Sequence, residues 1–262
     1  MSKAVITIHG YLSNVKDFGR LYDYLDFYDE VKAVKIPGHN DKVDMRKFTV
    51  NNTIDAVLSA YDELSQRHET IDVVGFSMGG ALTSWLCALR KVNRAVVFAP
   101  ANKYFNFNLP FDAVKFYGGL SYKSYKDADG DFKSKMSTLG KALSPYKDNF
   151  VTSVKLAWEL PLQHFTPHTY TVFSKLIKLC NQAVQDYAPV KTPVLVIWGR
   201  LDELVPRKTI DFWIQHFTNC QTKIYEDIGH PMLYTNRDHL LIRDAVEFLS
   251  EGQIVHEVPP NS

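Results

Sequence analysis

The sequence has few of the features that mark disulfide-rich, metal-binding, membrane-spanning or nucleic-acid-binding proteins. Its three cysteines are far apart and show no CxxC spacing, so they indicate neither a disulfide framework nor a zinc site. No stretch approaches the roughly 20 apolar residues that a membrane-spanning helix needs. The 30 Lys and Arg residues nearly balance the 29 Asp and Glu residues, which gives no electrostatic reason to expect a nucleic-acid partner. We therefore expect a small-molecule substrate, no metal and no integral membrane segment.

The cysteines and the first residues also bear on where the protein resides. An odd number of cysteines without a pairing pattern suits a reducing compartment. The chain enters an apolar strand directly after Lys3 and lacks the longer apolar run and cleavage site of a secretory signal. The sequence therefore predicts a cytoplasmic protein. It leaves open whether that protein is a monomer or a homodimer.

The order of apolar segments predicts an α/β fold. Short β-branched runs alternate with amphipathic stretches, which is typical of a mostly parallel sheet covered by helices on both faces. About six strands are expected, at residues 4–8, 31–36, 71–75, 95–99, 194–198 and 222–225. Helices are expected at residues 15–25, 53–68, 78–90, 206–217 and 238–249, with Thr53 as the capping start of the second.

The alternation stops between residues 100 and 190, where aromatic residues and lysines are frequent. We expect a core formed by residues 1–100 and 189–250, a helical cap inserted at residues 101–188, and a loosely ordered tail at residues 251–262. Two cap helices are predicted, one after Ser144-Pro145 and one after Thr166-Pro167. Each proline follows a capping residue and suits the first turn of a helix.

The clearest chemical signal is Gly75-Phe-Ser77-Met-Gly79, between an apolar strand and a helical stretch. In this setting Gly-x-Ser-x-Gly is a nucleophile elbow, a sharp turn that lifts the serine hydroxyl clear of the backbone so that it can attack a carbonyl. Gly75 and Gly79 remove side chains that would clash, and Gly80 lets the helix come close to the sheet. The competing interpretation is an ordinary glycine-rich turn whose serine only caps the helix.

Ser77 needs an imidazole to accept its proton and a carboxylate to orient that imidazole. In this architecture the acid follows a late strand, and the histidine lies in a loop before the last helix. Asp202 and His230 meet these placements, and Glu203 is a competing carboxylate. We therefore predict Ser77 as nucleophile, His230 as base and Asp202 as the orienting acid.

The transition state also needs donors for its oxyanion. His9-Gly10-Tyr11 ends the first strand, where a backbone N–H can point at the substrate oxygen. We assign the two donors to the backbone N–H groups of Tyr11 and Met78. His9 is expected to brace this loop, and His39 to brace another loop at Pro37-Gly38-His39.

Together these segments resemble the α/β-hydrolase superfamily, in particular its carboxylesterase and monoacylglycerol lipase-like branch. The resemblance rests on the His9-Gly10-Tyr11 loop, the Pro37-Gly38-His39 loop, the elbow at Ser77, Trp198-Gly-Arg-Leu-Asp202 and Gly229-His230. It implies an acyl-enzyme hydrolase of carboxylic esters that needs no cofactor, with the insertion as a lid over the acyl pocket. The chain departs from the family in starting directly at the strand before His9, so the early edge strands are absent. The insertion shows no recognisable motif.

Substrate and reaction stay open in part. Aromatic residues of the insertion are candidates for lining the acyl pocket or for packing inside the cap; they are Phe105, Phe107, Phe111, Phe116, Tyr117, Tyr122 and Trp158. Alternatives to ester hydrolysis are a carbon–carbon bond hydrolase or lyase of the same fold, an acyltransferase, and a slow-turnover ligand-binding member. Halide-removing relatives are disfavoured because they resemble this elbow with aspartate at the position of Ser77.

Overall fold

The computed structural model describes residues 2–39, 43–104, 123, 134, 136–138, 166–251 and 258–259. Its centre is a six-stranded sheet in the order β2-β1-β3-β4-β5-β6, and every neighbouring pair of strands is parallel. The strands are β1 (Lys3–Ile8), β2 (Glu30–Val34), β3 (Thr70–Phe76), β4 (Ala95–Phe98), β5 (Val194–Gly199) and β6 (Cys220–Tyr225). All six lie where the sequence predicts strands, with ends that differ by one or two residues.

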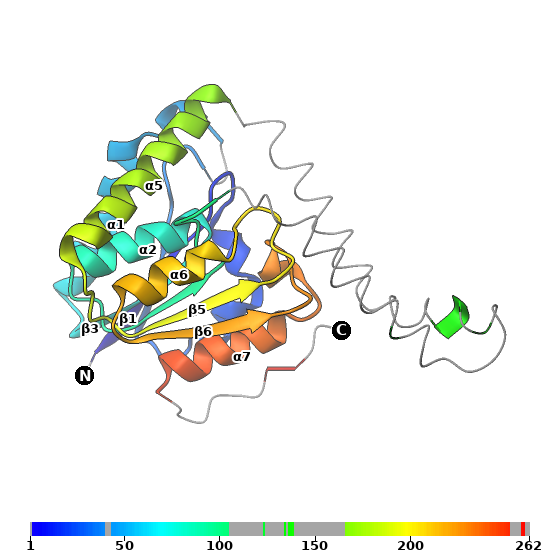
Figure 1. Cartoon of the computed structure of the whole chain (residues 1–262). Coiled ribbons are helices and arrows are strands. Elements are labelled where there is room, and N and C mark those ends of the chain that lie inside the picture. The colour runs from blue at the N-terminus through cyan, green and yellow to red at the C-terminus, as the bar shows by residue number, and fades with distance from the viewer. Residues whose placement is uncertain are drawn as a thin grey trace.

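Helices cover both faces of the sheet (Figure 1). The 3₁₀ segment η1 (Val15–Tyr24) and α7 (Asp238–Leu249) pack on one face, and α1 (Val50–Ser65), α2 (Met78–Leu89), α5 (Pro167–Tyr187) and α6 (Lys208–His216) on the other. The described part of the chain also contains two short 3₁₀ turns, η2 (Met45–Lys47) and η3 (Met232–Tyr234). Successive strand side chains point to opposite faces, so Ala4 and Ile6 of β1 join one hydrophobic cluster and Val5 joins the other. Two apolar cores therefore fix the sheet from both sides.

The helices predicted at residues 53–68 and 15–25 differ most from the structure. The prediction that α1 starts at Thr53 is wrong. The hydroxyl of Thr49 accepts a hydrogen bond from the N–H of Asn52, and the helix begins at Val50. Thr53 lies inside the first turn and donates its own hydroxyl to the carbonyl of Thr49. The segment at residues 15–24 is a 3₁₀ helix interrupted at Gly19, where φ is 46°, and not one regular amphipathic helix.

Helix α5 begins as the sequence predicts, at Thr166-Pro167, where the Thr166 hydroxyl accepts a hydrogen bond from the N–H of Thr169. It lies alongside α2, and its apolar side chains, including Leu176 and Cys180, join the same buried cluster as the sheet. The range assigned to the cap therefore ends in a helix that packs as part of the core layer. The other expected cap helix, after Ser144-Pro145, lies outside the described residues.

Helix α6 begins at Lys208, two residues after the predicted proline start, and α7 has the predicted bounds. Pro259 of the predicted tail accepts a hydrogen bond from Arg20 through its carbonyl. None of the helices in the described ranges has the length and apolar character needed to cross a membrane.

Candidate active site

Ser77 occupies a sharp turn between β3 and α2. Its φ of 53° and ψ of −115° lie in a region that non-glycine residues rarely adopt, and such strain is common at functional sites. The side chain makes no capping hydrogen bond to α2. The alternative of a serine that only caps the helix is therefore excluded, and the hydroxyl is available for another partner.

The glycines around Ser77 allow three backbone segments to meet. A Cβ placed on Gly79 would lie 1.8 Å from the carbonyl oxygen of Ile8, and one on Gly75 would lie 2.5 Å from the carbonyl oxygen of Gly79. A Cβ on Gly80 would lie 2.6 Å from the Cβ of Pro100. The end of β1 and the start of α2 therefore approach each other more closely than any side chain permits.

Ser77, Asp202 and His230 converge at one edge of the sheet. They follow β3, β5 and β6 respectively, and the carboxyl ends of parallel strands share an edge. The Oγ of Ser77 lies 3.0 Å from Nε2 of His230, and Nδ1 of His230 lies 2.9 Å from Oδ2 of Asp202. Because a carboxylate only accepts, Nδ1 carries the proton and Nε2 is left to accept from the serine hydroxyl.

Neighbouring groups fix the acid and the base in place. Oδ1 of Asp202 accepts the N–H groups of Leu204 and Val205 at 2.9 and 2.7 Å, and the whole residue is buried. The imidazole of His230 packs against the ring of Phe76, with centroids 5.3 Å apart. Both side chains are therefore held before any substrate binds.

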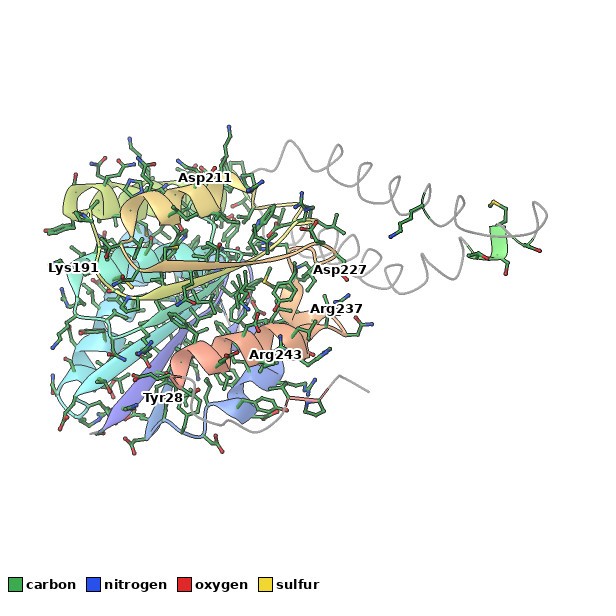
Figure 2. The ribbon with its side chains drawn as sticks, turned by 60° about the horizontal axis from the view of Figure 1, so that its bottom comes forward. Tyr28, Lys191, Asp211, Asp227, Arg237 and Arg243 are labelled. Atoms are coloured by element: carbon green, nitrogen blue, oxygen red, sulfur yellow. The ribbon has the colours of Figure 1, made fainter. Side chains whose placement is uncertain are left out.

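An ion pair closes the loop that carries His230. Asp227 and Arg237 stand on either side of this loop, and Nη1 of Arg237 contacts Oδ2 of Asp227 (Figure 2). Asp227 is buried, so the pair lies partly out of solvent, where screening is weaker than at an exposed site. The two ends of the loop are thereby joined.

Three carboxyl groups act on His230. Burial alone lowers the pKa of its imidazole, but the charges of Asp202, Glu203 and Asp17 outweigh burial, and the net pKa lies above its ordinary value. Oε2 of Glu203 accepts the backbone N–H of His230 at 3.0 Å. Of the two adjacent carboxylates, Asp202 thus contacts the ring and Glu203 contacts the main chain.

Asp17 belongs to the same group of acids and is not among the site residues predicted from the sequence. It is 5% exposed, Tyr234 donates its phenol to Oδ1 at 2.7 Å, and Oδ2 has no hydrogen-bond partner among the residues that the structure describes. Burial raises the pKa of Asp17 to about 6. No motif marks this residue, because its partners His230 and Tyr234 lie more than 200 positions away in the chain.

The loop after β1 lies beside Ser77. A Cβ on Gly10 would lie 3.2 Å from the Cβ of Ser77. No residue in the described ranges accepts a hydrogen bond from the N–H of Tyr11. Met78 begins α2, and the first N–H groups of a helix have no acceptor within it. Within the described ranges, neither of these two N–H groups therefore has a backbone acceptor.

His9 braces the loop that carries Tyr11, as the sequence predicts. Its ring is buried; Nδ1 contacts the carbonyl of Gly10 at 2.9 Å, and the N–H of Ile36 donates to Nε2 at 3.4 Å. Burial, followed by the nearby His39, lowers the pKa of His9 to about 3. This ring is therefore neutral, and its two nitrogens link the carbonyl of Gly10 to the N–H of Ile36.

The remaining predictions concern the aromatic candidates of the insertion, His39 and a metal site. The aromatic candidates Phe105, Phe107, Phe111, Phe116, Tyr117, Tyr122 and Trp158 lie outside the described residues. His39 packs edge-on against Phe48, with ring centroids 4.8 Å apart. Within the described ranges, no group of three or more His, Cys, Asp and Glu side chains is arranged to hold a metal ion.

Residues 1–237 match the profile of the family described as serine aminopeptidase, S33. The chain belongs to this family. The family is one of hydrolases, so the chain is an enzyme of this class. A pimeloyl-[acyl-carrier protein] methyl ester esterase of Neisseria meningitidis is 23% identical over 267 residues, covering 94% of each chain.

Solved structures share the fold. A monoacylglycerol lipase of Paleococcus ferrophilus has a TM-score of 0.65 at 18% identity, covering 95% of both chains. A meta-cleavage product hydrolase of Pseudomonas fluorescens has a TM-score of 0.60 at 18% identity, covering 96% of this chain and 92% of that one. The predicted α/β-hydrolase fold is confirmed, and at these identities the likeness extends to the fold alone.

Proposed function

We propose that this S33-family hydrolase cleaves carboxylic esters through an acyl-enzyme on Ser77. The observation that carries the proposal is the hydrogen-bonded chain from Ser77 through His230 to Asp202, with links of 3.0 and 2.9 Å. This arrangement lets a neutral imidazole take the serine proton while the carboxylate stabilises the imidazolium that forms. Ser77 thereby becomes nucleophilic near neutral pH.

Each residue has a defined role in the proposed reaction. Ser77 attacks the ester carbonyl as His230 accepts its proton, and the N–H groups of Tyr11 and Met78 stabilise the oxyanion. His230 then gives the proton to the departing alcohol, and the acyl group remains on Ser77. Water attacks this acyl-enzyme with His230 again as base, which releases the acid and restores the serine.

The comparisons support an ester as the substrate class. The Neisseria relative is named for a methyl ester and the Paleococcus structure for a monoacylglycerol, and both compounds contain a carboxylic ester. The family description names an aminopeptidase, whose amide substrate requires the same nucleophile, base and oxyanion donors. We favour the ester because the Neisseria and Paleococcus proteins are both named for one, whereas the Pseudomonas meta-cleavage product hydrolase fits the carbon–carbon alternative.

Fluorophosphonate labelling tests the nucleophile. We expect the wild type to be labelled and Ser77→Ala to be unlabelled, because the phosphorus reagent reacts only with an activated hydroxyl. Ser13→Ala is the matched control, since it removes a hydroxyl from the neighbouring loop after β1. Equal labelling of wild type and Ser77→Ala contradicts the proposal.

A substrate panel tests the reaction class. p-Nitrophenyl esters of increasing acyl length are compared with an aminoacyl p-nitroanilide and a vinylogous diketone. We expect turnover of the esters, and the preferred acyl length tests the predicted acyl pocket in the insertion. Turnover of the anilide alone indicates an aminopeptidase, and turnover of the diketone alone indicates a carbon–carbon bond hydrolase.

We also propose that the enzyme works in the cytoplasm. All three cysteines are free thiols, and Cys87 and Cys180 are buried. Burial raises the pKa of both thiols, which keeps them unreactive. Microscopy of the tagged full-length chain tests this location.

A further inference from the structure

The loops that carry Asp202 and His230 are joined along their length. The N–H of Arg200 donates to the carbonyl of Tyr225 at 2.8 Å, and the N–H of Leu201 donates to the carbonyl of Ile228 at 3.1 Å. A Cβ on Gly199 would lie 2.1 Å from that carbonyl oxygen of Ile228, so the two backbones are in direct contact. The acid loop and the base loop therefore form one continuous unit.

This unit holds His230 at two points. Asp202 accepts a hydrogen bond from the ring Nδ1–H of His230 at 2.9 Å, and the adjacent Glu203 accepts one from its backbone N–H at 3.0 Å. His230 is 8% exposed, so solvent offers little replacement for the second bond. Asp202 therefore holds the ring of His230, and Glu203 holds the main chain from which that ring extends.

We propose that Glu203 is a positioning residue, which holds the backbone of His230 so that Nε2 stays within reach of Ser77. The inference rests on the proposed function and adds a second acidic residue, beside Asp202, to its requirements. The acceptor is a carboxyl oxygen, and it accepts an N–H whether the group is ionised or protonated. The hold on the backbone is therefore separable from the charge of Glu203.

The charge has its own effect on the base. Burial, followed by the charge of Asp202, raises the pKa of Glu203 to about 7, within the range in which imidazoles titrate. The acids that face His230 are Asp202 and Glu203 from the loop after β5 and Asp17 from η1, with Tyr234 bonded to Asp17. Loss of the Glu203 charge lowers the pKa of His230.

Two substitutions separate these effects. Glu203→Gln keeps a carbonyl acceptor and removes the charge, whereas Glu203→Ala removes both. Glu226→Gln is the matched control because it removes a charge from the loop after β6. Glu226 pairs there with Arg200, and the side chain of Glu226 is exposed to solvent. The readouts are the rate of fluorophosphonate labelling of Ser77, kcat and KM for a p-nitrophenyl ester, the pH profile and the melting temperature.

We expect Glu203→Ala to lower kcat and the labelling rate by about ten- to a hundredfold, with KM nearly unchanged, because a misplaced base costs rate and not binding. Glu203→Gln is expected to restore both to within about threefold of wild type, and to move the rising limb of its pH profile to lower pH as the negative charge is lost. The control is expected to change none of these. If the melting temperature of Glu203→Gln is near that of wild type, its recovered kcat and labelling rate come from a folded protein.

The outcomes distinguish this proposal from the one on which it rests. Labelled wild type together with Glu203→Ala reacting at the same rate overturns the role of Glu203 alone. Equal loss of rate in Glu203→Gln and Glu203→Ala also overturns it, because the restored acceptor then has no effect. Absence of labelling in the wild type overturns the proposed function, and the role of Glu203 with it.

Discussion

The phenol of Tyr11 donates a hydrogen bond to the hydroxyl of Thr169, 2.7 Å away, and so links the loop after β1 to the first turn of α5. The same ring stacks on Phe173 of α5, with centroids 4.9 Å apart. Tyr11 also provides one of the two N–H groups that we assign to the oxyanion. The side chain of this residue therefore anchors the backbone donor to a helix that packs on α2.

We predict that Tyr11→Phe lowers kcat by about three- to tenfold, since part of the stabilisation given by one oxyanion donor is lost when that donor is less well held. The ring and its stacking remain, so KM and the melting temperature are expected to change little. Steady-state hydrolysis of a p-nitrophenyl ester measures the effect.

Tyr104→Phe is the control for this experiment. The phenol of Tyr104 also donates a hydrogen bond to α5, at Ser174, 3.2 Å away. Tyr104 follows β4, however, and is not one of the residues assigned as oxyanion donors. We expect this variant to keep kcat. Equal losses in both variants would show that the effect comes from loosening α5 and not from the oxyanion donor.

The pH dependence of hydrolysis provides a second prediction. Only the neutral form of His230 accepts the serine proton, and the net pKa of this imidazole lies above its ordinary value of 6.5. Activity is therefore expected to rise with pH, with a midpoint above 6.5. The measurement is kcat/KM from pH 5 to 10, which reports the free enzyme. A midpoint below 6.5 is incompatible with three carboxyl groups acting on this ring.

Asp202→Asn gives the corresponding test of the acid. It removes the largest of the charges that raise the pKa of His230 and leaves the lowering effect of burial. We expect the midpoint to move to lower pH. The rate at the plateau is expected to fall by up to about 10⁴-fold, as when a triad acid is replaced by its amide in serine proteases. Unchanged plateau activity would remove Asp202 from the proposed mechanism.

The sequence alone predicts that Ser77, Asp202 and His230 come together, and the structure brings them within hydrogen-bond distance. Ser77 lies in a motif that requires a strand before it and a helix after it, and β3 and α2 supply both. Asp202 and His230 follow from chain order, because the edge on which parallel strands end is set by the topology. The motif around Ser77 is local, and the placement of Asp202 and His230 follows from topology. Both can be recognised in a single sequence.

The features that sequence did not give depend on distances through space. Thr49 and Thr53 are both suitable helix caps, and only the extended backbone at Thr49 decides between them. The sequence marks Glu203 only as a rival to Asp202, because its contact with the backbone of His230 depends on how closely two loops approach. Asp17 lies 213 positions before His230 and follows no spacing rule.

Asp17 provides a prediction about stability. Burial raises its pKa from 3.8 to about 6, so folding favours the protonated acid. The stabilising effect of this shift is present below pH 3.8 and is lost as pH rises through about 6. At pH 8 we expect Asp17→Asn to be more stable than wild type by on the order of 3 kcal/mol at most, at 1.36 kcal/mol for each pKa unit. The advantage is expected to shrink towards pH 4.

Urea unfolding of the two proteins at pH 4.5, 6 and 8 measures this difference. The amide oxygen that the substitution introduces still accepts the phenol of Tyr234, so the comparison isolates the charge. Asp23→Asn is the control because Asp23 is exposed on the same 3₁₀ segment, and its free energy of unfolding is expected to stay within about 0.5 kcal/mol of wild type. A stability gap for Asp17→Asn that does not grow with pH contradicts the assignment.

The elbow itself yields the last prediction, which separates lack of space from backbone strain. In Gly79→Ala the new methyl group would overlap the carbonyl oxygen of Ile8, and neither β1 nor α2 can move without disturbing Ser77. We expect a loss of more than about 3 kcal/mol of unfolding free energy, or failure to fold, and no fluorophosphonate labelling. Gly19→Ala is the control: Gly19 has a φ of 46° but no atom nearer than 3.9 Å to an added Cβ, so strain alone is expected to cost about 1–3 kcal/mol. Gly79→Ala folding as well as Gly19→Ala, with labelling intact, would mean that β1 and α2 do not meet as closely as the structure shows.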